Sequence, residues 1–324
     1  MFSYRKILRQ AIDTTWKNKY LWFFGLFATL IGTGGEYQLL NNISENDGEK
    51  MFFKLSSSPL FDAGTWSNLF SYFSSDYWQA MSSVILLVVI ASLAIFILIL
   101  SVTSQGALVH QTEKIINKKN KDINLSSGTL AGQKHFWPVL AINIGLKIVI
   151  SLMFALIAIP IIFSGGSGLT MVIYVILFLL FIPIIIGFSL IARYAISYIV
   201  IKKNKLSEAL DNAWYLFKKN WLVSIEMAII LVLINILFAL AVVILIFLIS
   251  APFLILSIMF SGFAIFWLFA FLGIVILFLS IITFGSMITT FQISAWTILF
   301  LSLLGKKGKS KIKRLKDKEK GLKK

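Results

Sequence analysis

Three ionisable side chains lie within the long apolar stretches of the sequence, and they are the first candidates for chemistry. They are Lys147, Arg193 and Glu226. A charged group at bilayer depth is costly, so it usually pairs with another polar group or lines a path for ions or polar solutes. All three are expected on the cytoplasmic half of the bilayer, where they can share one polar cluster. Four amides are further candidates for this cluster: Gln105, Asn143, Asn235 and Gln292.

Two interpretations of this cluster are open. In the first, Lys147 and Glu226 form a structural ion pair, and the long side chain of Arg193 reaches the membrane surface. In the second, the cluster lines a route for a small solute or ion. The first is favoured because a translocation route usually carries more ionisable groups than these.

No catalytic or cofactor motif is recognisable elsewhere in the sequence. The chain has no cysteine, which excludes disulfides and thiolate metal sites, and its two histidines are too few for a zinc site. The glycine-rich turn at 165–168 lacks the lysine of a phosphate-binding loop. The acidic stretch at 44–49 lacks the carboxylates that a calcium loop needs at its first and last positions. We therefore expect no enzyme, no cofactor and no metal site.

Composition restricts the class of protein. The chain has 324 residues, of which 58% are hydrophobic and 14% are charged, and its mean hydropathy is +0.89. About a quarter of the residues of a soluble domain are charged. These values exclude a soluble domain and indicate a polytopic membrane protein, for which an all-α transmembrane helical bundle is expected.

The apolar stretches give the expected spans, since a helix needs about 20 apolar residues to cross a bilayer. The first candidate, 21–32, reaches this length only if its helix begins near Trp16, and an uncleaved span is favoured over a signal peptide. Six spans are predicted, with eight as the alternative. The other stretches are 81–103, 137–163, 171–200, 222–248 and 253–304.

The last of these stretches is too long for a single span. Residues 274–304 are predicted to form the sixth span, and Phe253–Leu272 to form a re-entrant or buried segment on the outer side. The eight-span alternative cuts the stretch near Ser261-Gly262 and again near Gly273.

Charge orients the spans. The segments 1–20, 104–136, 193–221 and 305–324 hold 27 of the 30 lysines and arginines, whereas the loop 35–80 is acidic. Basic residues flanking spans stay in the cytoplasm. This pattern predicts a multi-pass protein of the plasma (inner) membrane, with both termini cytoplasmic and the loop 35–80 outside.

Three cytoplasmic segments share a design that suggests a weak threefold internal repeat. In each, an amphipathic helix leads through an aromatic residue into a span. The clearest copy has Leu206, Leu210, Ala213, Trp214, Phe217 and Trp221 on one helical face, the first copy has Leu8, Ile12, Trp16 and Tyr20, and the middle copy covers 125–137. Within one membrane domain of residues 1–304, the predicted units are about 1–103, 104–200 and 201–304.

The same segments carry a family resemblance. The motif Trp16-Lys17-Asn18-Lys19-Tyr20-Leu21-Trp22, then Gly25-Leu26-Phe27, resembles the opening of many bacterial integral membrane proteins. Gln105-Gly106-Ala107-Leu108 and Arg193-Tyr194-Ala195 leading to Leu206-Ser207-Glu208-Ala209-Leu210 resemble the same group. These six-span proteins are similar to the membrane domain of glycerophosphoryl diester phosphodiesterase. The resemblance implies a helical membrane fold and no catalytic residues, because nothing here resembles the catalytic domain.

The basic C-terminal tail, 305–324, is predicted to be disordered and to contact anionic lipid at about 1 kcal/mol per lysine near the surface. A nucleic-acid partner is not expected, since the tail has no interleaved aromatics. We expect a non-enzymatic membrane-organising or accessory protein with interfacial lipid contacts and protein partners still to be found, or alternatively a transporter or channel using the polar cluster. The candidate lipid-contact residues of the tail are Lys306, Lys307, Lys309, Lys311, Lys313 and Arg314.

Overall fold

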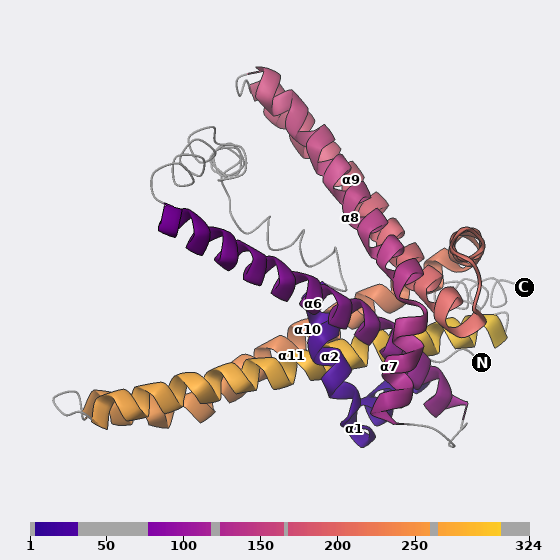
Figure 1. Ribbon diagram of the computed structural model, residues 1–324. Helices are drawn as coiled ribbons and strands as arrows, with labels where there is room; N and C mark the ends of the chain where they lie inside the picture. The colour runs from indigo at the N-terminus through magenta and orange to yellow at the C-terminus, as the bar shows by residue number, and fades with distance from the viewer. Residues whose placement is uncertain (1–3, 32–76, 118–123, 165–167, 260–264, 306–324) are drawn as a thin grey trace, which may run out of the picture. The chain divides into compact units, whose positions relative to one another are not determined.

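The computed structural model describes residues 4–31, 77–117, 124–164, 168–259 and 265–305, and every regular element in these ranges is a helix. Five of the helices are long and apolar enough to cross a membrane. The predicted class, an all-α polytopic helical bundle, is confirmed. The helices are α1 (Tyr4–Lys17), α2 (Leu21–Ile31), α6 (Tyr77–Ile116), α7 (Leu125–Lys134), α8 (Phe136–Ser164), α9 (Gly168–Ser197), α10 (Leu206–Met259) and α11 (Ile265–Gly305), with a π-helical turn η2 (Tyr198–Lys202) continuing α9 (Figure 1).

The chain packs as two compact units. The first comprises residues 1–33, 100–142 and 190–324, and the second comprises 34–99 and 143–189. Helices α6, α8 and α9 are therefore each divided, with one part in the first unit and the other part in the second. These two packing units do not correspond to the three predicted repeat units, 1–103, 104–200 and 201–304, and the repeat stays a prediction.

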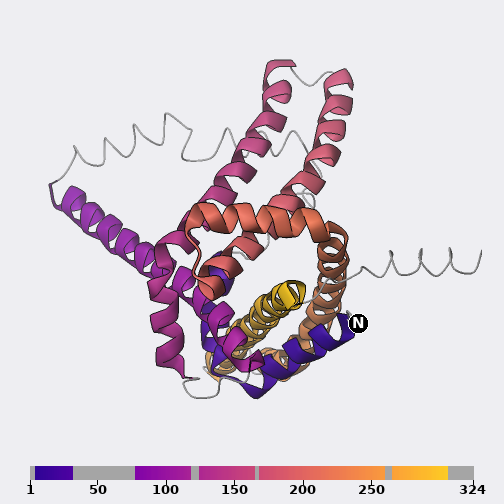
Figure 2. The same cartoon turned by 90° about the vertical axis from the view of Figure 1, so that its right-hand side faces the viewer.

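The C-terminal half of α11 is the centre of the first unit. Every residue from 289 to 300 is buried, so this part of the helix is covered on all sides. In Figure 2 the end of α11, coloured yellow, lies inside a ring to which α1, α7 and α10 contribute. Serine and threonine recur along the buried stretch, so the helix offers hydroxyls as well as apolar contacts to its neighbours.

Helix α2 approaches α11 very closely at Gly25. A Cβ atom on this glycine would overlap the carbonyl oxygen of Ser286 and the hydroxyl of Thr290. The Ser286 hydroxyl donates to the Trp22 carbonyl, and the Thr29 and Thr289 hydroxyls are 2.7 Å apart. Small residues four apart, as in Gly25 and Thr29, let membrane helices bring their backbones together.

Other hydrogen bonds connect the remaining helices of this unit. Thr112 of α6 lies 3.1 Å from Ser294 of α11, hydroxyl to hydroxyl. Tyr194 of α9 and Ser224 of α10 lie 2.7 Å apart, again between hydroxyl oxygens. Each of these pairs joins side chains from different helices, so the first unit is held by polar contacts as well as by packing.

Helix α7 packs through two glycines. A Cβ atom on Gly132 would overlap the Thr103 carbonyl of α6, and one on Gly128 would press against the ring of Phe24. The amide of Gln111 also donates to the hydroxyl of Ser127 at 2.9 Å. Glycine weakens a helix in isolation, but here it permits the contact that holds the helix.

Each of the three amphipathic segments is followed by one residue at which the helix is interrupted before the next apolar helix begins, and this residue is called the elbow below. Asn18 follows α1, His135 follows α7, and Asn220 is a non-helical residue (φ −126°, ψ 28°) within α10. The side chain of each reaches the carbonyl four residues before it, at 2.9, 2.8 and 3.1 Å respectively. Seven residues before each elbow stands a buried small residue: Ala11, Gly128 and Ala213. The three copies thus share local construction.

The described parts of Phe253–Leu272 belong to the end of α10, which continues through Pro252, and to the beginning of α11. The expectation of a buried segment is wrong for many of these described side chains, whereas a re-entrant placement stays a prediction. The exposed side chains include Ile258 and Trp267, which are 71% and 74% exposed. Helix α11 also passes through Gly273 without a break. The two helices run side by side (Figure 1).

The helix of the first predicted span, α2, also starts later than a full span requires. Its helix does not begin near Trp16, because α1 ends at Lys17 and α2 begins at Leu21. The 11 residues of α2 rise about 16 Å, roughly half of a bilayer core. The predicted outer loop up to Asp76 and the tail beyond Gly305 lie outside the described residues.

The second unit contains the apolar parts of three helices. Ile150 of α8 and Ile185 of α9 are buried together, with Leu146, Met153 and Phe181 packed around them. Along α6, side chains such as Leu87 and Ile95 are 60% and 61% exposed. A helix that exposes apolar side chains to this extent is suited to contact with lipid.

The close approach at Gly25 gives a direct stability test. Gly25→Ala is expected to lower the free energy of unfolding by about 1–3 kcal/mol, because the new methyl group meets backbone that must move. Gly285→Ala is the matched control, since a Cβ there meets nothing within 4 Å. The control should be neutral or stabilising by up to about 1 kcal/mol. Equal effects in denaturant titrations of the two purified variants would contradict the packing described.

Candidate functional site

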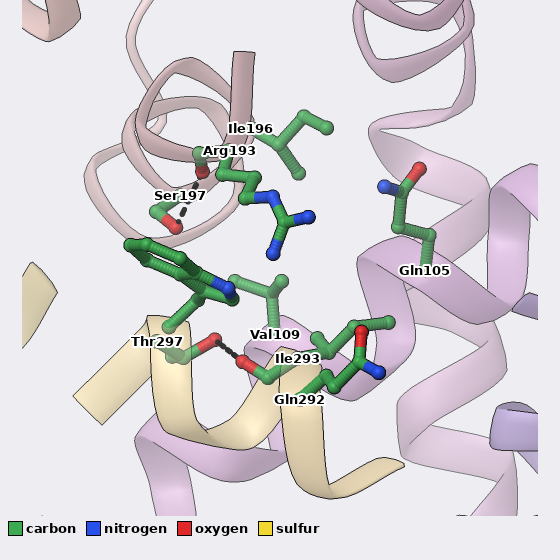
Figure 3. Close-up of a pocket in the computed structure, with 9 residues that line it drawn as sticks. Gln105, Val109, Arg193, Ile196, Ser197, Gln292, Ile293 and Thr297 are labelled. Carbon is green, nitrogen blue, oxygen red and sulfur yellow. Dashed lines mark hydrogen bonds between the residues drawn. The ribbon is translucent and has the colours of Figure 1, made fainter. Parts of the chain in front are cut away.

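Three predicted members of the polar cluster line one small cavity. Gln105 comes from α6, Arg193 from α9 and Gln292 from α11, and the cavity measures about 30 Å³. This is room for about one water molecule. Figure 3 shows the Arg193 guanidinium reaching from α9 toward the space between α6 and α11.

The local sequence explains why these three helices meet. Two residues after each polar residue comes a small one with no exposed surface: Ala107, Ala195 and Ser294 respectively. Small side chains at these positions let the three helices approach. The helix segments that carry Gln105, Arg193 and Gln292 therefore lie together in the structure.

Arg193 is held over an aromatic ring. Its guanidinium carbon is 4.9 Å from the centroid of the Trp296 ring, and the tryptophan is buried. A cation over a tryptophan face is attracted by the ring quadrupole, more strongly where water is excluded. The hydroxyls of Ser197 and Thr297 donate to carbonyls of their own helices at 3.0 and 2.8 Å. The side chain of Arg193 is therefore held in place by its contact with Trp296, and its expected position relative to the membrane surface stays a prediction.

The remaining predicted residues lie elsewhere. The carboxylate of Glu226 accepts a hydrogen bond from the Tyr4 hydroxyl, which joins α1 to α10. Asn235 is buried farther along α10. Lys147 is exposed and Asn143 is half-buried on the part of α8 that belongs to the second unit, so the pairing of Lys147 with Glu226 stays a prediction. The tail residues Lys306 to Arg314 lie outside the described residues.

A second feature is the outward face of the amphipathic segments. In α1 the predicted apolar stripe includes Ile12 and Trp16, which are 53% and 56% exposed, while Ala11 on the other side is fully buried. In α10 Trp214 is 54% exposed and Ala213 is fully buried. The fully buried positions named here are small, but larger residues such as Ile7 and Leu216 are buried as well, so only part of the apolar side chains face away from the bundle.

The middle copy follows the same rule. In α7 the buried positions are Gly128 and Gly132, whereas Leu130 is 66% exposed. Trp137, at the start of α8, is 76% exposed. All three segments therefore expose tryptophan or leucine beside basic residues such as Lys17, Lys134 and Lys218, which are themselves exposed.

Sequence reasoning missed three elements of this arrangement. It gave no role to Tyr4, to Trp296 or to the two glycines of α7, Gly128 and Gly132. Gly128 and Gly132 are four residues apart, and this spacing is a known signal for close helix contact. Nothing in the sequence indicated that Tyr4 and Glu226, 222 residues apart, would meet.

Among the described residues, no group of three His, Cys, Asp or Glu side chains is placed to hold a metal ion. Comparisons with family models, curated proteins and solved structures give no match to this chain. The resemblance to the phosphodiesterase membrane domain therefore stays a prediction.

The contact of Arg193 with Trp296 predicts a stability difference between two cation–aromatic pairs. Arg193→Gln should cost about 1–2 kcal/mol of unfolding free energy because the pair is largely shielded from water. Lys219, 5.6 Å from the Tyr215 centroid on an exposed surface, is the comparison, and Lys219→Gln should cost about 0.5 kcal/mol. Denaturant titration of the two variants measures both losses. A larger cost at Lys219 would contradict a shielded Arg193.

Proposed function

We propose that this integral membrane protein is a non-enzymatic organising or accessory protein that contacts lipid at the cytoplasmic interface. The supporting observation is the repeated outward stripe, represented by Trp16 in α1, Leu130 in α7 and Trp214 in α10. Amphipathic helices with aromatic and leucine side chains on one face and basic residues nearby bind in the headgroup region. Three such helices in one chain give a broad lipid-binding surface.

The proposal includes a topology. We take the five long helices and α2 as six spans, with both termini in the cytoplasm of a bacterial-type plasma membrane, although the described residues of α2 cover only about half of the bilayer core. Helix α11 has 41 residues and rises about 60 Å, twice the thickness of the bilayer core. Tilt absorbs only part of this excess, so one end of α11 is expected to extend beyond the hydrocarbon core. The basic tail adds attraction to anionic lipid.

Spin labels test whether the stripe lies in lipid. The chain has no cysteine, so single cysteines at Ile12, Leu130 and Trp214 can be labelled without background. In vesicles containing anionic lipid, these labels should collide more often with oxygen, which concentrates in lipid, than with a water-soluble nickel complex. Labels at the neighbouring exposed positions Asp13 and Asp211 should show the reverse preference.

A preference for the nickel complex at all three stripe positions would overturn the proposal, because the stripe would then face water. Such a result would leave a soluble protein as the partner of these helices. The labelled variants must retain a cooperative unfolding transition, which establishes that the measured exposure belongs to the folded chain.

The alternative function, a transporter or channel, has one observation in its favour. The cavity lined by Gln105, Arg193 and Gln292 is partly polar and lies where three helices meet. Its volume of about 30 Å³ holds a single water, which supports a structural role better than a route for solutes. If Arg193→Gln abolished ion or solute flux into vesicles while the fold was retained, the transporter would replace the first proposal.

A further inference from the structure

A larger cavity lies between α1, α10 and α11, apart from the cavity at Arg193. Its volume is about 220 Å³. It is lined by Ile12, Thr15 and Trp16 of α1, Ile234, Asn235 and Phe238 of α10, and Met287, Ile288 and Phe291 of α11. All of them belong to the first packing unit.

Water is a poor occupant for this cavity. The volume corresponds to about seven water molecules at liquid density, but seven of the nine lining residues are apolar, so these waters would find few hydrogen bonds. The hydroxyl of Thr15, which also lines the cavity, donates to the Ala11 carbonyl of its own helix at 2.9 Å. An empty cavity of this size would destabilise the fold in proportion to its volume. An apolar occupant is therefore favoured.

The cavity is open to the surroundings through α1. Ile12 and Trp16 line it and are nevertheless more than half exposed. They belong to the stripe that the proposed function places at the lipid interface, so the apolar group nearest to the opening is the acyl chain of a lipid. This step rests on that proposed function.

Charge around the opening selects the kind of lipid. Lys17 directly follows Trp16, Lys19 comes two residues later, and Arg9 lies two turns earlier on α1; all three are exposed. One exposed acid, Asp13, stands among them. Lysines near the bilayer surface attract anionic headgroups, and their effects add.

We propose that the cavity between α1, α10 and α11 binds one acyl chain of an anionic phospholipid, whose headgroup is held by Lys17 and Lys19. The site would fasten α1 to the α10–α11 pair through a lipid. Its occupant is a specific, stoichiometric ligand, in contrast to the lipid that surrounds the stripe.

Photo-crosslinking tests the site on the full-length chain in phosphatidylcholine vesicles. The probes are phosphatidylglycerol and phosphatidylcholine, each carrying a diazirine in one acyl chain. The phosphatidylglycerol probe should label peptides around Trp16, Phe238 and Ile288, and saturate at one lipid per chain. The double variant Lys17→Gln, Lys19→Gln should raise the probe concentration needed for half-maximal labelling about 25-fold, or about fivefold per lysine.

A cavity-filling variant supplies the matched control. Ile288→Trp places an indole in the cavity and should abolish labelling there, whereas Ile281→Trp, on the same helix at a 51% exposed position outside the lining, should leave it unchanged. Both variants are first checked for a cooperative unfolding transition. If Ile288→Trp does not fold, the lysine variant alone decides, since it leaves the core untouched.

Two results would overturn the inference: labelling at these peptides that never saturates, or equal labelling by both probes. If the stripe labels report lipid and the cavity is not labelled, the specific site fails while the proposed function stands. If the stripe labels report water, both fail together.

Discussion

The fold depends on how closely other helices can approach the C-terminal half of α11. Helices surrounded by lipid gain little from burying apolar side chains against each other, so they associate through close packing and interhelical hydrogen bonds. α11 supplies both, because residues 289–300 are buried on every side and include hydroxyls that reach α2 and α6. At Gly25 the absence of a side chain allows backbone contact. The polar cavity at Arg193 is a consequence of this convergence.

The need for close approach also explains which side chains of the three amphipathic segments pack against the bundle. Each turns small residues such as Ala11, Gly128 and Ala213 toward the bundle, and each ends at an elbow whose side chain binds the carbonyl four residues earlier. Tryptophan and leucine side chains such as Trp16, Leu130 and Trp214 are left exposed, and under the proposed function they meet the lipid interface.

The sequence predicts the fold class and the amphipathic helices, and the features that it does not predict have physical causes. Apolar length and composition predicted an all-α polytopic bundle, and the amphipathic segments were placed correctly as helices. Periodicity identified the stripe of Ile12 and Trp16, but not which side packs, because in a membrane protein small residues make the helix contacts. Residues 289–300 have no periodicity to detect because all of them are buried. The expected break between the stretches 222–248 and 253–304 is absent because Pro252 is accommodated within α10.

Cysteine cross-linking in native membranes tests the central contact most directly, since the chain has no cysteine of its own. Thr29→Cys combined with Thr289→Cys is expected to form a disulfide rapidly under mild oxidation, because the two hydroxyls are 2.7 Å apart. Thr29→Cys combined with Thr283→Cys, displaced by about 9 Å along α11, should not form one. Equal cross-linking of both pairs, or cross-linking of the second alone, would contradict the close packing of α2 on α11.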